Sequence, residues 1–184
     1  MKLSRRTYLK NTAAVAVSTS FPIKKAFSDI DPFNNLDATA QAALIKKKEI
    51  TALELVDASI DRILKFNPSL NAVVETSFEQ ARLIAKNQTS KGPFAGVPYL
   101  IKDLLNQQGL ITSSGSKLFE NRIPDYDDSV VADIRAEGGI VFCKTNTPEF
   151  GAGANTKNKV YGATCNPFDL TKTPAGSSGG SAAA

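Results

Sequence analysis

Lysine and serine side chains are the strongest candidates for chemistry in this sequence. Lys102 stands in an apolar segment, between residues 99–101 and 104–105. A lysine on a buried strand loses solvation of its ammonium form, so its pKa falls and its neutral amine can act as a general base. The local sequence leaves one alternative open, which is a lysine at a strand end with its ammonium in water and paired with Asp103.

A serine- and glycine-rich segment, residues 173–184 (TPAGSSGGSAAA), is the second candidate. Its glycines allow backbone to approach a substrate closely, and Ser177 and Ser178 supply hydroxyls that can donate and accept, as a proton relay requires. The alternative is a flexible linker, although residues 182–184 read as the start of a helix. A phosphate-binding loop is disfavoured because no Gly-Lys-Ser/Thr element is present.

The chain contains no histidine and two cysteines, Cys143 and Cys165. A Ser-His-Asp or Cys-His site cannot be completed from these residues, nor can they hold a histidine-ligated metal. Cys143 stands in an apolar run and Cys165 in a loop-like stretch, so we expect free thiols, with a disulfide as the alternative. The sequence therefore predicts no metal and no cofactor, and it limits a general base to Lys, Asp, Glu or Tyr.

The positive charge of the chain is confined to its beginning. The net charge is +4, but six of the 22 basic residues lie in residues 1–28, which contain no acid; the remainder has 16 basic and 18 acidic residues, a net of −2. Residues 4–10 (SRRTYLK) match the twin-arginine export pattern, and residues 26–28 offer a cleavage site. We expect residues 1–28 to be a signal peptide read by the twin-arginine machinery and residues 29–184 to be exported to a bacterial periplasm, with no nucleic-acid partner and no stable membrane insertion.

Helical patterns dominate the first half of residues 29–184, and strand patterns follow. Thr51 and Glu54 form a capping box, and Asn67-Pro68 is expected to end that helix. The expected helices are 37–48 (capped by Asp37), 51–67, 77–86 and a helix capped by Ser129 and closed by Gly138-Gly139; the expected strands are 72–74, 96–102 and 140–143. The fold class is α/β, with a helical N-terminal region followed by part of a mixed sheet that helices pack, incomplete at the C-terminus.

Four ordered blocks carry a resemblance to a known family. They are residues 96–105 (GVPYLIKDLL), 112–116 (TSSGS), 128–151 (DSVVADIRAEGGIVFCKTNTPEFG) and 166–184 (NPFDLTKTPAGSSGGSAAA). From about Asp37 to Ala184 the chain resembles the amino-terminal portion of the amidase signature family, whose members hydrolyse amide bonds through a Ser-Ser-Lys triad.

The resemblance implies a role for each matched residue. Lys102 matches the catalytic lysine, Ser177 the bridging serine held by a cis peptide, and Ser178 a supporting serine, whereas Lys144 matches a structural loop. Ala175 departs from the family, which more often has glycine there. The family's nucleophilic serine lies about two dozen residues further on, so it is expected beyond Ala184, and residues 1–184 alone are expected to be inactive.

Three functions stay open at this point. The first is hydrolysis of a small-molecule amide, and the second is a non-catalytic truncated remnant or binding module. The third is a protein like the A subunit of the tRNA-dependent amidotransferases. An export leader and the absence of basic character in residues 29–184 both argue against the third.

Overall fold

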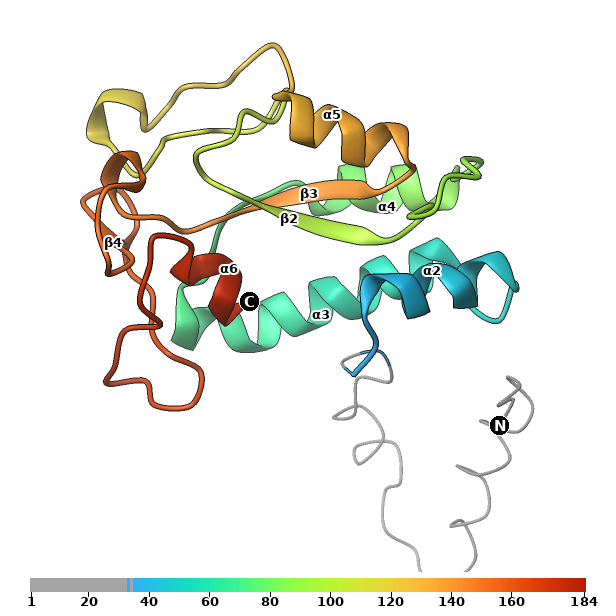
Figure 1. Cartoon of the computed structure of the whole chain (residues 1–184), viewed down its shortest axis with the longest axis horizontal. Coiled ribbons are helices and arrows are strands. Elements are labelled where there is room, and N and C mark those ends of the chain that lie inside the picture. Colours follow the sequence, from blue (N-terminus) through green and yellow to red (C-terminus); the bar gives the residue numbers. More distant parts are fainter. Residues whose placement is uncertain (1–32, 34) are drawn as a thin grey trace, which may run out of the picture.

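A computed structural model describes residue 33 and residues 35–184 as a small mixed sheet covered by helices (Figure 1). The expected leader, residues 1–28, lies outside the described residues. The helices are α2 (Ala38–Lys46), α3 (Ala52–Leu70), α4 (Phe78–Lys86), α5 (Ser129–Ala136) and α6 (Gly179–Ala183), with 3-10 turns η1 (Lys117–Phe119) and η2 (Glu149–Gly151). The strands are β1 (Val73–Thr76), β2 (Pro98–Lys102), β3 (Ile140–Thr145), β4 (Lys157–Asn158) and β5 (Gly162–Ala163). The α/β class predicted from the sequence is confirmed.

The central sheet has the order β1-β3-β2, with β1 antiparallel and β2 parallel to β3. Strand β3 extends two residues beyond the predicted end at Cys143. The β2–β3 register shifts at Phe142, so that Leu100 pairs with Cys143 and Lys102 with Thr145. This bulge reverses the alternation of side chains along β3, because one extra residue moves all later side chains to the opposite face.

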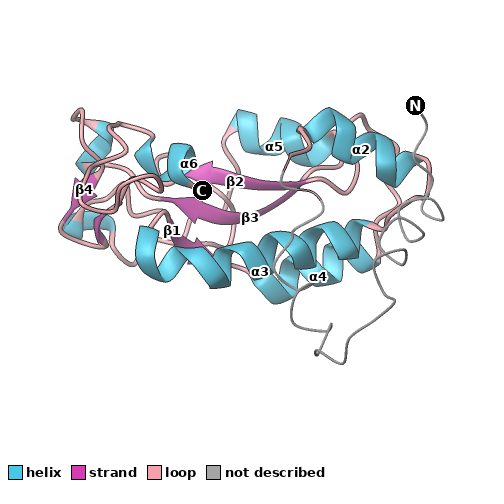
Figure 2. Cartoon of the chain, turned by 90° about the horizontal axis from the view of Figure 1, so that it is seen from below, coloured by secondary structure: helices cyan, strands magenta, loops and turns pink. Residues whose placement is uncertain are grey.

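Each face of the sheet has its own hydrophobic core. One core joins α3 and α4 to β1 and β3, and its fully buried members include Val56, Ile60 and Phe142. The other is smaller and packs α5 against Ile101 and Val141. Figure 1 shows α5 on one side of β2 and β3 and α3 on the other, and Figure 2 shows α3 and α4 side by side along the sheet. Within the described residues, no helix is both long and apolar enough to cross a bilayer.

Helix α3 begins as the sequence predicts but ends later. The capping box is formed, because Glu54 N donates to Thr51 Oγ1 (3.1 Å) and Thr51 N donates to Glu54 Oε2 (2.8 Å). The prediction that Asn67-Pro68 ends the helix is wrong, since α3 continues to Leu70 and closes at Asn71, which has a left-handed φ of 51°. The Asn67 side chain accepts from the amides of Ala72 and Val73, which satisfies the backbone beyond the proline.

Two predicted caps differ in detail. Ser77 precedes α4 but donates its hydroxyl to the carbonyl of Phe142 on β3 (2.9 Å) instead of capping the helix. Asp128, not Ser129, is the N-cap residue of α5. In both places tertiary contact overrides the local pattern, because Asp128 Oδ2 accepts from the amide of Asn106 (2.8 Å), in the segment that follows β2.

The last forty residues are mostly loop, as predicted, and return to the carboxyl ends of β2 and β3. The short helix α6 lies against β2 (Figure 1). Gly180 makes this approach possible, because a Cβ at that position would lie 2.3 Å from the amide nitrogen of Asn146. The end of the chain and the end of β3 are therefore held together by backbone contact.

Candidate active site

Lys102 is the last residue of β2, on the face that α6 covers. Its side chain is half-buried, and burial lowers the pKa of its amine from the ordinary value. Its Nζ donates to Ser177 Oγ at 2.7 Å, although the two residues are 75 positions apart in sequence. The structure therefore brings together the lysine and the first of the two serines that the sequence singled out.

Ser177 is held by contacts on both sides. The Gly176–Ser177 peptide is cis, as the resemblance implies. Thr147 Oγ1 donates to the Ser177 carbonyl (3.2 Å), and Gly176 packs so tightly that a Cβ there would lie 3.1 Å from the carbonyl carbon of Ala154. These contacts hold the backbone of the serine whose hydroxyl accepts from Lys102.

The loop before Ser177 contains the residue at which the sequence departs from its family. Ala175 has a φ of +65°, in the left-handed region that favours glycine and costs an alanine about 1–2 kcal/mol. Two bonds from Thr156 hold its carbonyl, one from the amide (3.1 Å) and one from Oγ1 (2.9 Å). The Thr156 hydroxyl also accepts from the amide of Gly179 (2.9 Å), so one buried threonine joins both ends of the loop.

Ser178, the predicted supporting serine, is exposed and is the N-cap residue of α6 without a side-chain capping bond. Its carbonyl accepts from the amide of Ala182 (3.0 Å). The hydrogen bond by which it would support the site stays a prediction.

Sequence reasoning missed the threonines that build the site. Thr145, the partner of Lys102 in the sheet, has its Oγ1 2.6 Å from Ser181 Oγ on α6. Thr147 and Thr156 hold the serine loop, and all three are buried. For Thr145 and Thr147 the available signal is the Lys-Thr-Asn-Thr run at the end of the apolar strand, since buried hydroxyls at a strand end must find partners.

Lys144 is the largest correction, because it lies in β3 and not in a loop. It is fully buried, and its Nζ donates to the carbonyl of Leu105 and to Thr112 Oγ1 (2.9 Å). Asp103 Oδ1 lies 4.0 Å from the same Nζ. Burial lowers the pKa of Lys144 to about 8 and raises the pKa of Asp103 above its usual range.

Three further acidic residues lie at a helix cap, in a loop and in the 3-10 turn η2. Asp128 caps α5, Asp127 accepts from the amide of Gln108 (2.7 Å), and Glu149 accepts from Ser116 Oγ (2.7 Å). Asp103 accepts from the amide of Ser113 (3.2 Å), and among the described residues its ion-pair partner is Lys144, not Lys102, so the alternative pair is not found.

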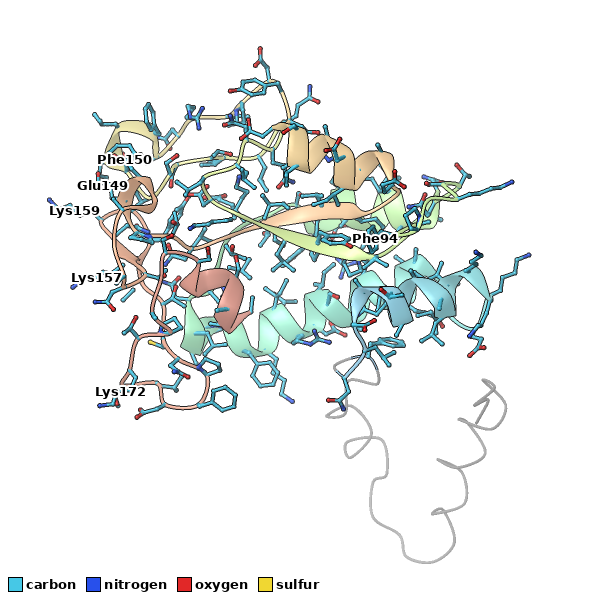
Figure 3. All side chains as sticks on the ribbon, viewed as in Figure 1. Phe94, Glu149, Phe150, Lys157, Lys159 and Lys172 are labelled. Atoms are coloured by element: carbon cyan, nitrogen blue, oxygen red, sulfur yellow. The ribbon has the colours of Figure 1, made fainter. Side chains whose placement is uncertain are left out.

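Other lysines near the C-terminal loops face solvent. Figure 3 shows Lys157, Lys159 and Lys172 at the edge of the molecule, pointing away from the sheet, and all three are exposed. Cys143 and Cys165 are free thiols. The described residues contain no group of three side chains with metal-ligand chemistry.

Comparison with known proteins supports a single family. The family profile described as Amidase matches residues 54–184. The 6-aminohexanoate-cyclic-dimer hydrolase of Paenarthrobacter ureafaciens is 44% identical over 151 residues, and the A subunit of glutamyl-tRNA(Gln) amidotransferase from Acidothermus cellulolyticus is 40% identical over 154 residues. Each match covers 80% of this chain and 30% of the relative.

Solved structures agree with these matches. The structure of 6-aminohexanoate cyclic dimer hydrolase complexed with substrate has a TM-score of 0.75 at 43% identity, over 80% of this chain and 31% of that one. The native peptide amidase from Stenotrophomonas maltophilia has a TM-score of 0.77 at 30% identity, over 84% of this chain and 34% of that one. The chain thus spans about a third of the length of these proteins, and it belongs to the amidase signature family.

Proposed function

We propose that this protein is an amide hydrolase and that residues 1–184 supply the base half of its proton relay, Lys102 and Ser177. The observation that carries the proposal is the 2.7 Å contact between Lys102 Nζ and Ser177 Oγ. Two further facts support it, which are the lowered pKa of Lys102 and the membership of the family. A neutral amine in contact with a hydroxyl can act as a general base without histidine.

In the proposed reaction, a serine from outside residues 1–184 attacks the amide carbonyl. Its proton passes to Ser177 Oγ while the Ser177 proton passes to the neutral Lys102 amine, and a tetrahedral intermediate forms. The proton then returns through Ser177 to the amide nitrogen, the carbon–nitrogen bond breaks, and the departing amine leaves an acyl-enzyme. Water then attacks the ester and gives a proton through Ser177 to Lys102. The same proton returns to the attacking serine as the ester bond breaks, which releases the carboxylic acid.

Two parts of this site are assigned outside residues 1–184: the attacking serine and the amides that stabilise the oxyanion. Residues 1–184 alone are therefore proposed to hydrolyse no amide. The relatives support this division, because the chain matches about 30% of their length. A non-catalytic remnant remains the alternative if the gene encodes nothing further.

The substrate is proposed to be a small-molecule amide. One relative is described as a hydrolase of a cyclic dimer of 6-aminohexanoate and another as a peptide amidase, which are different amides. The similarity to the A subunit of glutamyl-tRNA(Gln) amidotransferase favours a second candidate function, that of a subunit which works with partner proteins on glutamyl-tRNA. The acidic balance of residues 29–184 weighs against it.

The test uses the full-length gene product with a panel of aliphatic, aryl, peptide and cyclic amides. Turnover that Lys102→Ala removes and Lys172→Ala retains is expected, since Lys172 is an exposed lysine outside the site. Turnover that survives Lys102→Ala would contradict the relay. Glutamine-dependent transamidation of glutamyl-tRNA without small-amide turnover would favour the amidotransferase instead.

Export to the periplasm is a separate proposal that rests on residues 4–10. Fractionation of cells is expected to place the protein in the periplasm, and replacement of Arg5 and Arg6 by lysine is expected to retain it in the cytoplasm. An unchanged distribution in that variant would contradict the twin-arginine assignment.

A further inference from the structure

A buried polar cluster lies on the opposite side of β2 from the Lys102–Ser177 contact. Lys102 and Asp103 are adjacent at the strand end, so their side chains leave on opposite faces. Asp103 is completely buried, and its amide donates to the carbonyl of Thr145 (2.9 Å), which continues the sheet one residue past Lys102. The site and the cluster therefore share one piece of backbone.

Ser113 anchors the Asp103 carboxylate. Its amide donates to Oδ1 (3.2 Å) and its hydroxyl to Oδ2 (2.6 Å), while the amide of Gly115 donates to the same hydroxyl (2.9 Å). These contacts connect the end of β2 to residues 112–116, the block TSSGS that the sequence offers without an evident task. Ser113 is fully buried, so water does not compete for these bonds.

Lys144 fixes the turn that follows Lys102. The amides of Leu104 and Leu105 both donate to the Lys102 carbonyl (2.7 and 3.1 Å), and the Lys144 amine donates to the Leu105 carbonyl. Its bond to Thr112 ties the same amine to residues 112–116. The backbone of Lys102 is thus held by strand β3, by the turn at residues 104–105 and by residues 112–116.

A buried ion pair is a poor source of net stability, because the desolvation of two charges offsets their attraction. Its other use is to fix one geometry, since each charge accepts few arrangements of its partners. Here the arrangement that is fixed is the backbone of Lys102, and the amine must lie within hydrogen-bond reach of Ser177 for the relay to work.

We propose that Asp103 and Lys144, held to residues 112–116 by Ser113 and Thr112, are a positioning pair that keeps the Lys102 amine against Ser177. The proposal rests on the proposed function of Lys102. Neither member of the pair contacts Ser177, and both act through the backbone of Lys102. Among the described residues Lys102 has no ion-pair partner of its own, so its placement depends on this backbone.

The test compares two serines of the same loop in the full-length protein. Ser113→Ala removes the hydroxyl on Asp103, and Ser116→Ala, the matched control, removes an equally short bond to Glu149 (2.7 Å) that is not connected to β2. The reactivity of each lysine toward acetic anhydride is followed against pH by mass spectrometry. This labelling reports on Lys102 whether or not the protein turns over an amide.

In Ser113→Ala the pKa of Lys102 is expected to rise toward the ordinary value of a solvated lysine, because an amine released from Ser177 regains solvent. On any amide that the wild type hydrolyses, kcat should fall about tenfold with KM within twofold, and Ser113→Thr should restore both readouts. Ser116→Ala should leave the Lys102 titration unchanged. Thr112→Val, which replaces the hydroxyl that accepts from Lys144 by a methyl group, serves as a second variant with the same expected direction.

An unchanged Lys102 titration in Ser113→Ala and Thr112→Val, or an equal change in Ser116→Ala, would overturn the positioning role. The proposed function fails by a different result, which is amide turnover that persists in Lys102→Ala. The two failures are therefore distinguishable.

Discussion

Two lysines on neighbouring strands of this protein differ in almost every respect except their proximity in the sheet. Lys102 on β2 pairs with Thr145, and Lys144 directly precedes that threonine on β3. Lys144 is completely buried and has a carboxylate, Asp103, at 4.0 Å. Lys102 is half-buried, and its partner is the hydroxyl of Ser177.

If Lys102 is the base, as proposed, depth of burial is not what distinguishes it from Lys144. Burial lowers the pKa of both amines, but a carboxylate beside Lys144 favours its ammonium form and opposes that effect. A hydroxyl beside Lys102 carries no charge, so it accepts either form of the amine and can exchange a proton with it. The partner of each amine therefore fits a structural task for Lys144 and the proposed task of a base for Lys102.

The largest effect on activity is expected when Ser177, the uncharged partner of Lys102, loses its hydroxyl. Ser177→Ala should lower kcat of the full-length protein by roughly 10²–10⁴-fold, because the proton path to Lys102 is broken. Amide turnover is measured under saturating substrate, with Thr173→Ala in the exposed part of the same loop as control. Equal losses in the two variants would mean that the loop, not the relay, is responsible.

Replacement of Lys144 should cost more unfolding free energy than replacement of Lys102, although Lys102 is the lysine whose loss should abolish activity. Lys144→Met should cost about 3–5 kcal/mol of unfolding free energy, because it leaves the Asp103 carboxylate buried without its cation. Lys102→Met should cost little, since a half-buried amine without a carboxylate is replaced by an apolar side chain. Urea unfolding followed by circular dichroism checks both, and a larger cost for Lys102→Met would reverse the assignment.

A carboxylate placed beside Lys102 should favour its ammonium form, as Asp103 does for Lys144. Thr145→Asp puts an acid opposite Lys102 in the sheet, and an opposite charge at this range raises the pKa of an amine by about 1–3 units. The acidic limb of the kcat/KM profile should move to higher pH by that amount. Thr145→Asn, which loses the same bond to Ser181, should show no shift; a shared shift would exclude the charge as its cause.

The smallest effect concerns the pH dependence of stability. The folded pKa of Lys144 is lowered from 10.5 to about 8, so the unfolded chain binds the proton more tightly between those values. The cost of burying the ammonium is therefore complete below pH 8 and is relieved as the pH rises toward 10.5, by an amount on the order of 1 kcal/mol or more.

Urea midpoints between pH 7 and pH 10.5 measure this slope, which Lys144→Met should flatten. Besides Asp103, the charges that act on Lys144 are those of Glu75, Arg122, Asp127 and Asp128. The wild type and Lys144→Met both contain these residues, so the comparison isolates the lysine. Parallel curves for the two proteins would assign the slope to other groups.

Local patterns in the sequence determined most of the elements of this protein. The capping box of α3, the apolar run of β3 and the paired glycines after α5 each act over a few residues, so the sequence displays them directly. The absence of histidine means that residues 1–184 cannot by themselves supply a Ser-His-Asp or Cys-His site. Lys102 and Ser177 were singled out by their neighbours and by the family resemblance.

Tertiary structure decided which polar groups meet. The bulge at Phe142 sets the faces of the sheet on which Lys144 and Thr145 lie. The local sequence pattern does not predict the position of a β-bulge. Asn67 carries α3 past a proline through bonds to the following strand. The contacts from Lys102 to Ser177 and from Lys144 to Thr112 join positions 75 and 32 residues apart. Such contacts depend on the packing of the whole sheet, because a side chain's partner is fixed by which backbone segments fold next to it.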